Sequence, residues 1–472
     1  MAIIGRKSEQ TALKSFTESD KAEFVAIYGR RRVGKTFLIR EFFNNKFAFY
    51  HTGLANSGME MQLHSFNNSL NNYGKVSYPE TKTWFDSFEQ LKRLLSRSRK
   101  KGKKVVFIDE MPWIDTPRSG FLSALEHFWN GWASGQKDIL LIVCGSITSW
   151  MVEKLLDNHG GLHNRVTQQI HLRPFSLSEC EEYYKKFKFE ISHHEMVENY
   201  MIFGGIPFYL SLMQRQFSMA QNVDNLFFTE SAQLKNEFRN LYASLFKKAE
   251  NHIKVVEVLS NKAKGLTRNE IINTTKLPDG GSLNRTLKEL ELSGFIRRYK
   301  NYGKKSRQSM YQLVDFYTLF YFSFLKDNVF NDEHYWTNFI ENARHRAWSG
   351  YAFEQVCLAH LSQIKRKLGI SGVLTNAYSW KSNDKDNGAQ IDLVIERNDK
   401  VINLCEMKFA NGEFSINKKY EENLRHKRTA FKEETKTREA IHIVMITTYG
   451  IKRNEYRWIV QSEVIMNDLF MK

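Results

Sequence analysis

Short apolar runs in the first third of the chain predict buried strands. The runs are FVAIYG at residues 24–29, VVFI at 105–108 and DILLIVCGS at 138–146. Each run is short and ends at glycine or charged residues, which is typical of strands inside a sheet. The stretch FLIREFF at 37–43 predicts a helix directly after the first strand. The pattern therefore predicts an α/β region.

The pattern changes near residue 250. TRNE at 267–270 has the form of a capping box and predicts the start of a helix. LPDGG at 277–281 predicts a turn, and the leucines that follow it lie near helical spacing. Two helices joined by a tight turn suit a helix-turn-helix. FYTLFYFSFL at 316–325 predicts an aromatic helix that packs in the core.

The last region predicts a hairpin and a helix before it. AQIDLVIERNDKVINLCEMKF at 389–409 has the pattern of strand, turn and strand, with RNDK at the turn. If this turn centres near residue 398, Asp392 lies opposite Leu404 and diagonal to Glu406. AWSGYAFEQVCLAHLSQI at 347–364 predicts an amphipathic helix that carries Glu354.

Composition places the chain among globular proteins of several domains. It has 472 residues, 42% of them hydrophobic and 26% charged, and chains of this length form about three domains. No apolar run of about 18 residues predicts a membrane span, and MAIIGRKSEQ lacks the apolar core of a signal peptide. Four well-separated cysteines suit a reducing cytoplasm rather than a disulfide scaffold or a structural zinc site.

The net charge of +17 favours a polyanionic partner, because neutralising phosphates releases condensed counterions. A generally lysine-rich composition would give the same charge, so the placement of the basic residues is more informative than their number.

The first strand runs into GRRRVGKT, which has the spacing of a phosphate-binding loop. Glycines allow backbone N–H groups to surround phosphate oxygens, and the N-terminus of the helix adds its positive dipole. Lys35 is expected to reach the β- and γ-phosphates of ATP, and the Thr36 hydroxyl to bind Mg²⁺. The alternative is a glycine turn without a ligand. The candidate nucleotide-binding residues are Gly29, Arg30, Arg31, Arg32, Val33, Gly34, Lys35 and Thr36.

Acidic residues at the end of the second buried run complete a nucleoside triphosphatase pattern. Asp109 is expected to bind Mg²⁺, and Glu110 to polarise the attacking water. Ser146, at the end of the third run, is a candidate contact to the γ-phosphate or to that water. Arg165 is a candidate that stabilises transferred charge in a neighbouring subunit, which requires a homo-oligomer. An ordinary surface arginine is the alternative.

These segments resemble the prokaryotic ATPase family within the AAA+/STAND-related P-loop superfamily. The resemblance is carried by IIGRKSEQ, YGRRRVGKT, VVFIDEMPW, VCGSITSW and FGGIPFYL. It implies a RecA-like core with a helical lid that ends near residue 240. Arg6 is similar to the family position beside the nucleotide base. The family's glycine-arginine finger is represented here by Asn164-Arg165.

RRYKNYGKKSRQ at 297–308 predicts a glycine-tipped hairpin that carries six basic residues and no acid. Such a hairpin beside a helix-turn-helix is typical of the wing of a winged helix that touches DNA. A packing module with a solvated basic hairpin is the equal alternative. The six basic residues are Arg297, Arg298, Lys300, Lys304, Lys305 and Arg307.

Three carboxylates and a lysine are predicted to converge in the last region. Glu406 and Lys408 share one face of a strand because they are two residues apart. Asp392 lies on the neighbouring strand, and Glu354 on the preceding helix. These acids are embedded among apolar residues, where burying them without a cation is costly. A solvated sheet edge and a structural ion pair with Lys408 are the alternatives.

The same residues resemble the PD-(D/E)xK nuclease superfamily, with Gln390 at an accessory position. Together with the ATPase pattern, they resemble ATPase proteins whose C-terminal region is of the DUF234 type. The resemblance implies a restriction-endonuclease-like α/β fold in which Asp392 and Glu406 bind Mg²⁺ or Mn²⁺ and Lys408 acts on the nucleophile or on developing charge. A nuclease-like fold without activity is the alternative.

The sequence therefore predicts a cytoplasmic, ATP-hydrolysing, DNA-binding protein with a nuclease domain. The family resemblance alone implies a role in defence or mobile-element biology. Its rivals are a regulatory or signalling ATPase whose nuclease-like domain is inert and a protein-binding switch with no nucleic-acid partner. The predicted domains are an ATPase core at 1–175, a lid at 176–245, a winged helix at 246–328 and a nuclease-like domain at 329–472.

Overall fold

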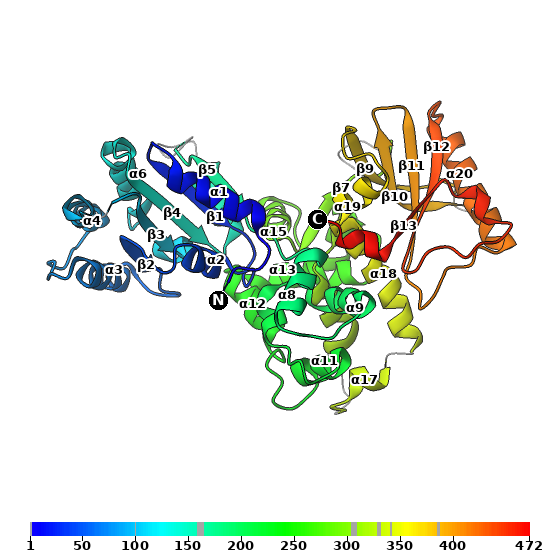
Figure 1. The fold of residues 1–472 in the computed structure, drawn as a ribbon, viewed down its shortest axis with the longest axis horizontal. Helices are drawn as coiled ribbons and strands as arrows, with labels where there is room; N and C mark the ends of the chain where they lie inside the picture. The colour runs from blue at the N-terminus through cyan, green and yellow to red at the C-terminus, as the bar shows by residue number, and fades with distance from the viewer. Residues whose placement is uncertain are drawn as a thin grey trace. The chain divides into compact units, whose positions relative to one another are not determined.

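In the computed structural model the chain forms two compact units, Met1–Pro174 and Phe175–Lys472 (Figure 1). The finer division into four domains stays a prediction. The structure describes residues 2–99, 101–157, 165–303, 309–327, 332–339, 342–384 and 388–472.

The first unit is built on a five-stranded sheet in which every neighbouring pair is parallel. The strand order is β2-β3-β4-β1-β5, which confirms the predicted α/β class. The strands are β1 (Glu23–Tyr28), β2 (Phe49–Thr52), β3 (Lys104–Asp109), β4 (Ile139–Gly145) and β5 (Gln168–His171). The helices are α1 (Lys7–Glu18), α2 (Lys35–Phe42), α3 (Met59–Gly74), α4 (Trp84–Arg97), α5 (Met111–Ile114), α6 (Phe121–Gly131), η1 (Ala133–Gly135), α7 (Thr148–Trp150) and the π-helix η2 (Met151–Leu156).

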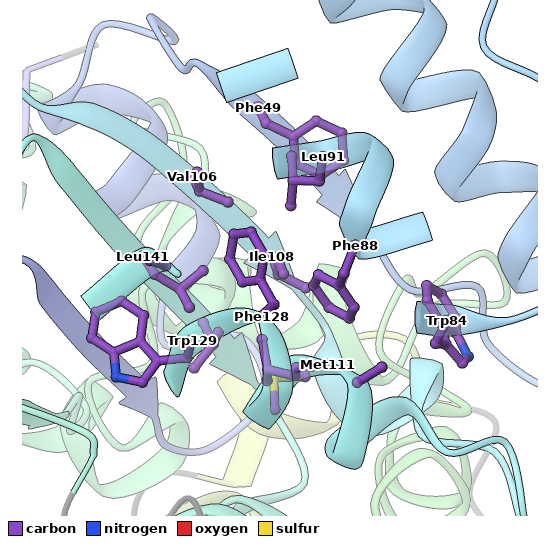
Figure 2. Packing of buried hydrophobic residues seen from close by; sticks show 14 of the residues in the cluster. Phe49, Trp84, Phe88, Leu91, Val106, Ile108, Met111, Phe128, Trp129 and Leu141 are labelled. Carbon is purple, nitrogen blue, oxygen red and sulfur yellow. The ribbon is translucent and has the colours of Figure 1, made fainter. Parts of the chain in front are cut away.

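The core of this unit lies between the sheet and helices α3, α4 and α6. Helix α4 begins at Thr83, whose hydroxyl accepts the N–H of Asp86, and its apolar residues recur at helical spacing, so that one face is buried. Figure 2 shows Phe88 of α4 near Ile108 of β3 and Phe128 of α6. This packing fixes β1, β3 and β4 side by side, and their carboxyl ends meet at one edge, where open α/β sheets bind ligands.

The second unit begins with five helices. The first two, α8 and α9, each begin at a capping box, formed by Ser176 with Glu179 and by Ser192 with Glu195. The helices are α8 (Leu177–Lys186), α9 (His193–Phe203), α10 (Pro207–Ser211), α11 (Met219–Phe227) and α12 (Glu237–Leu245).

The GGIP segment after α9 needs both of its glycines. Gly204 ends the helix at φ 62°. A Cβ on Gly205 would lie 2.2 Å from the carbonyl oxygen of Phe175. Pro207 then begins α10, where its missing N–H has no helical partner to lose. The segment is therefore a tight connection that only glycine permits.

Within the second unit, residues 249–303 and 309–313 form a group of helices and strands that we call the three-helix module. Its sheet has the antiparallel order β6-β8-β7. The predicted capping box of Thr267 and Glu270 is present at the start of α14. The winged-helix interpretation of the module stays a prediction. Its elements are α13 (Ala249–Ser260), β6 (Leu266–Thr267), α14 (Arg268–Thr275), α15 (Gly281–Leu292), β7 (Ile296–Tyr299) and β8 (Met310–Leu313).

The aromatic segment after the module packs in the core, as predicted. It forms α16 (Phe316–Phe320) followed by the π-helix η4 (Tyr321–Leu325), and Phe316, Phe320 and Phe324 are buried.

The C-terminal part is a mixed five-stranded sheet with helices. Strands β9, β10 and β11 are antiparallel neighbours, and β11, β12 and β13 are parallel neighbours. The strands are β9 (Thr375–Lys381), β10 (Gln390–Arg397), β11 (Val401–Lys408), β12 (Ala440–Thr447) and β13 (Ser462–Ile465). The helices are α17 (Tyr335–Phe339), α18 (Ala343–Ala359), α19 (Leu361–Lys367), α20 (Lys418–Thr435), η5 (Arg457–Ile459) and η6 (Met466–Phe470). Within the ranges that the structure describes, no helix combines the length and apolarity that a membrane crossing requires.

The predicted register between β10 and β11 is wrong, because the turn is centred one residue later than predicted. Leu404 pairs with Val394 rather than with Asp392. The turn is a three-residue loop centred on residue 399, in which Lys400 takes the left-handed conformation at φ 68°. Continuing the register by one pair beyond Leu393 and Cys405 sets Asp392 directly opposite Glu406. The two acids are therefore closer than the sequence predicted.

Candidate functional site

The loop between β1 and α2 has the backbone that a phosphate cradle requires. A Cβ on Gly29, whose φ is 142°, would lie 2.3 Å from the carbonyl oxygen of Leu172. Gly34 precedes α2 at φ 88°. The ammonium of Lys35 is buried and donates to the carbonyls of Gly29 and Arg30, each at 2.9 Å. The lysine is thus folded back along the loop that would hold the phosphates.

The remaining loop residues differ in exposure. Arg30 and Val33 are buried, Arg31 is exposed, and Arg32 is half-buried in the left-handed conformation. Arg6 is also buried, and its guanidinium donates to the carbonyl of Val33 at 3.2 Å. The structure therefore places Arg6 against the loop, and its position beside the nucleotide base stays a prediction.

The two acids at the carboxyl end of β3, Asp109 on the strand and Glu110 just after it, accept hydrogen bonds from hydroxyl groups. The Thr36 hydroxyl donates to a carboxylate oxygen of Asp109 at 2.7 Å. The Ser146 hydroxyl, from the end of β4, donates to Glu110 at 2.6 Å. Oxygen donors of this kind suit Mg²⁺, so Thr36 and Asp109 fit a magnesium site. Ser146, predicted to face phosphate or water, contacts Glu110 here.

Glu110 occupies a strained backbone position. Its φ of 47° is left-handed, which non-glycine residues rarely adopt. Such positions concentrate at functional sites, where the surrounding structure holds them. From this position, just after the end of β3, the carboxylate of Glu110 accepts the hydrogen bond from Ser146.

Two further residues bear on this site. Tyr50 on β2 lies near Asp109, and burial followed by the charge of Asp109 raises the pKa of its hydroxyl. Sequence reasoning missed Tyr50 because nothing in its strand marks it. Arg165 is exposed on a turn before β5, and its predicted neighbour Asn164 lies outside the described residues.

Helix α18 and strands β10 and β11 bring the three predicted carboxylates into one electrostatic cluster, but two of them are paired with lysines. Glu406 is 4% exposed and accepts from Lys427 of α20 at 2.7 Å. Asp392 accepts from Lys264 of the three-helix module at 2.9 Å. A β-bulge between Ile391 and Val394 disturbs the pairing of β10 with β9 around Asp392, and bulges often re-aim a side chain at a site.

The electrostatics of Glu354 place it in the same cluster. Burial first, and then the negative charge of Asp392, raise the pKa of Glu354 to about 7. The charges of Lys264 and Lys408 lower this pKa, and that of Glu406 raises it. Burial also raises the pKa of Glu406, while Lys427 opposes this shift. The charges of Asp392 and Glu406 thus shift the pKa of Glu354, as happens when several carboxylates lie close together.

Tyr420 is the residue that sequence reasoning missed most clearly at this site. Its ring lies 5.7 Å from the ammonium of Lys408. Its hydroxyl is buried and has no hydrogen-bond partner within the described part of the chain. Burial, and then the charges of Glu406 and Asp392, raise the pKa of this hydroxyl. An orphaned hydroxyl beside carboxylates suits a site that takes a further polar group.

The oxygen donors of this cluster fit a hard divalent cation. In this structure, however, two of the carboxylates are paired with lysines. Carboxylate oxygens and a phenol suit Mg²⁺ and Mn²⁺. Across the ranges that the structure covers, no three Asp, Glu, His or Cys side chains are arranged as a metal-ligand group. The cations beside Asp392 and Glu406 are instead the ammonium groups of Lys264 and Lys427.

The structure describes only part of the predicted basic hairpin. Arg298 and Lys300 are exposed. Arg297 donates to Gln312 at 2.7 Å and packs over the Tyr299 ring, so its side chain is engaged within the module. The predicted DNA contacts Lys304, Lys305 and Arg307 lie outside the described residues.

Comparison with known proteins supports an ATPase domain in the first part of the chain. Residues 4–213 match a family described as an ATPase domain predominantly from Archaea. An uncharacterized protein of Methanocaldococcus jannaschii is 25% identical over 418 residues, which cover 86% of this chain and 87% of that protein. An uncharacterized ATP-binding protein of the same organism is 46% identical over 44 residues, which cover 9% of this chain and 75% of that protein.

Two solved structures resemble the chain at low identity. A Walker-type ATPase of Pyrococcus abyssi is 15% identical with a TM-score of 0.48, over 68% of this chain and 96% of that one. The ORC2 protein of Aeropyrum pernix is 13% identical with a TM-score of 0.38, over 66% of this chain and 90% of that one.

Proposed function

We propose that this chain, whose residues 4–213 match the family described as an ATPase domain predominantly from Archaea, is an ATP-hydrolysing, DNA-binding protein with a metal-dependent nuclease site in its C-terminal sheet. The ATPase character follows from the family and from the cradle at Lys35. The nuclease assignment rests chiefly on one observation, the convergence of Glu354, Asp392 and Glu406 in one electrostatic cluster.

At the ATPase site, Lys35 would bind the β- and γ-phosphates, and Thr36 and Asp109 would hold Mg²⁺. Glu110 would orient and polarise the attacking water once its hydrogen bond to Ser146 is exchanged for that water. The backbone of residues 29–36 would surround the phosphates. Arg165 of a neighbouring copy would stabilise transferred charge, which makes the active form a homo-oligomer.

At the nuclease site, Asp392 and Glu406 would hold Mg²⁺ or Mn²⁺, with Glu354 in support. The metal would supply an activated water and stabilise charge on the phosphate. Lys408 would orient the nucleophile or neutralise the developing charge, and the ring of Tyr420 keeps its ammonium in place. Glu354, with a pKa of about 7, is able to exchange a proton near neutral pH.

DNA would be bound by the three-helix module in its winged-helix interpretation. The exposed positions Asn284, Arg285 and Lys288 lie on one face of α15, the helix that would enter the major groove. Arg298 and Lys300 on the hairpin would contact phosphates. The net charge of +17 supports such a partner.

A second function is favoured by the two lysines. If Lys264 and Lys427 are permanent partners of Asp392 and Glu406, the site is a structural ion-pair cluster. The protein is then a regulatory ATPase with an inert nuclease-like domain.

A plasmid-nicking assay separates the two functions. Supercoiled DNA is incubated with the full chain and Mg²⁺ or Mn²⁺, with and without ATP. We expect nicking by the wild type and none by Glu406→Gln. Lys408→Met should retain metal binding but cut far more slowly, since it acts on the water and the developing charge.

Lys35→Ala serves as the matched control, because it removes ATP hydrolysis and leaves the carboxylate cluster intact. Absence of nicking by the wild type under every condition, with ATPase activity preserved, would reject the nuclease and leave the regulatory ATPase.

A further inference from the structure

The three-helix module is docked onto the C-terminal sheet beside the carboxylate cluster. Asn301, just after β7, forms a parallel bridge with Ser379 of β9. The N–H of Tyr302 donates to the carbonyl of Ser379 at 2.8 Å, and the Ser379 hydroxyl donates to the Asn301 side chain at 2.7 Å. The backbone that follows β7 thus extends the edge of the sheet at β9. Edge strands favour association of this kind.

An aromatic contact supports this docking. The ring of Tyr302 lies 5.4 Å from that of Tyr378 on β9 and 5.2 Å from that of Phe431 on α20. Its hydroxyl donates to Glu396 at 3.1 Å. The contact therefore joins the module to both the sheet and the helix that carries Lys427.

The loop that carries Lys264 is held in place from within the module. The Tyr299 hydroxyl donates to the carbonyl of Lys264, and the Gln312 amide donates to the carbonyl of Ala263. A Cβ on Gly265, which has φ 72°, would lie 2.3 Å from the carbonyl oxygen of Tyr311. Only glycine allows the loop to approach β8 this closely. Lys264 is therefore pre-positioned before it meets Asp392.

The two lysines of the cluster differ in how easily they leave. Lys427 is 20% exposed and its partner Glu406 is 5% exposed in their side chains. Lys264 is 52% exposed, although its partner Asp392 is only 14% exposed. An ion pair with an exposed lysine contributes little to stability, whereas breaking a buried pair is costly. Lys264 is thus the removable cation of the cluster.

We propose that the three-helix module is a gate on the carboxylate site, with Lys264 as the group that blocks Asp392 when the gate is closed. The inference rests on the proposed nuclease function and specifies its regulation. In the closed state, the ammonium of Lys264 competes with a divalent cation for Asp392. Undocking of residues 301–302 from β9 removes Lys264 and lets Asp392 and Glu406 bind metal together.

The test measures Mn²⁺ binding to the full chain without nucleotide, by electron paramagnetic resonance and calorimetry. The variant Lys264→Met removes the blocking charge. Lys262→Met, two positions earlier in the same loop, removes an equal charge as a matched control. We expect Lys264→Met to bind Mn²⁺ more tightly by up to about fivefold, the range of an exposed ion pair, and Lys262→Met to match the wild type.

A disulfide lock tests the movement itself. The side chains of Asn301 and Ser379 already meet, so the double variant Asn301→Cys with Ser379→Cys is expected to lock the gate on oxidation and free it on reduction. The four described native cysteines are buried. The oxidised form should bind Mn²⁺ more weakly than the reduced form of the same protein.

The outcomes separate the gate from the nuclease proposal. Equal Mn²⁺ affinity in wild type, Lys264→Met and both states of the lock, with binding still lost in Glu406→Gln, would overturn the gate and leave the nuclease standing. No binding that depends on Glu406 in any of these forms would overturn the nuclease proposal and the gate with it.

Discussion

The chain holds two pairs of acids that differ in their partners. At the end of β3, Asp109 and the next residue, Glu110, accept hydrogen bonds from the hydroxyls of Thr36 and Ser146. On β10 and β11, Asp392 and Glu406 accept from lysine ammonium groups. Hydroxyl partners orient a carboxylate without cancelling its charge, whereas lysine partners supply a counter-charge.

The two pairs of acids therefore differ in how easily a divalent cation could bind to them. The acids of the ATPase site have hydroxyl partners rather than lysine partners, so in the proposed function Mg²⁺ bound with ATP would complete the site. The acids of the C-terminal cluster already have cations, and a divalent metal must displace at least one of them. The comparison supports our proposal of one site that is open to metal and one that is gated by the three-helix module.

The largest expected effect is at the open site. Glu110→Gln removes the group that we propose to polarise water, and we expect a loss of turnover of roughly 10²–10⁴-fold, the usual contribution of a general base. ATP binding should remain, since the glutamine keeps the size of the side chain. Lys35→Ala should instead lose ATP binding. Nucleotide titration and phosphate release on both purified variants measure these effects, and wild-type turnover in Glu110→Gln would contradict the site.

The next effect is on stability at the lysine-paired cluster. Lys427→Met leaves the buried Glu406 without its cation, and we expect a loss of about 3 kcal/mol, typical of breaking a buried pair. Lys264→Met should cost far less because its ammonium is half exposed. Calorimetric melting of both variants compares them, and the double variant Lys427→Met with Glu406→Gln should recover part of the loss. Equal melting temperatures for the two single variants would remove the distinction between them.

Much of the first site could be predicted from sequence, because its chemistry lies in contiguous segments. The loop at 29–36 is read from spacing alone, and Asp109 ends an apolar run that is visible in the sequence. Outside this site, the capping box at Thr267 was predictable for the same reason, because it too is a local pattern. The placement of Ser146 against Glu110 could not be read, because it depends on two adjacent parallel strands.

The C-terminal cluster shows where the sequence stops being informative. Glu354, Asp392 and Glu406 were predicted from their embedding among apolar residues. Lys264 lies 128 positions from Asp392, and nothing local links them. The pairing of Asp392 was also wrong, because the conformation of Lys400 at the turn is not encoded by a strong signal such as Asn-Gly. Tertiary packing decides such contacts.

A smaller effect is expected in the dependence of stability on pH. The pKa of Glu354 rises from its ordinary 4.5 to about 7 in the folded chain, so the folded state binds more protons than the unfolded state between these values. The free energy of unfolding should therefore fall as pH rises through this window. Glu354→Gln should flatten that fall. Denaturant unfolding between pH 4.5 and 7.5 tests this, and an identical slope in the variant would exclude the shift.

The smallest effect is expected at Ser146. Ser146→Ala removes the hydroxyl that holds Glu110 but leaves the carboxylate in place, so turnover should change by less than about tenfold, in keeping with the modest energy of one hydrogen bond. Steady-state ATPase assays measure this change. A loss as large as that of Glu110→Gln would mean that Ser146 takes part in the chemistry directly.

The central claim is that the chain has two separate metal sites, and counting them tests it most directly. Mn²⁺ binding to the full chain is followed by electron paramagnetic resonance with a non-hydrolysable ATP analogue. The account predicts two classes of site, one lost in Lys35→Ala and the other in Glu406→Gln. A single class that disappears in Lys35→Ala and is unchanged in Glu406→Gln would contradict it.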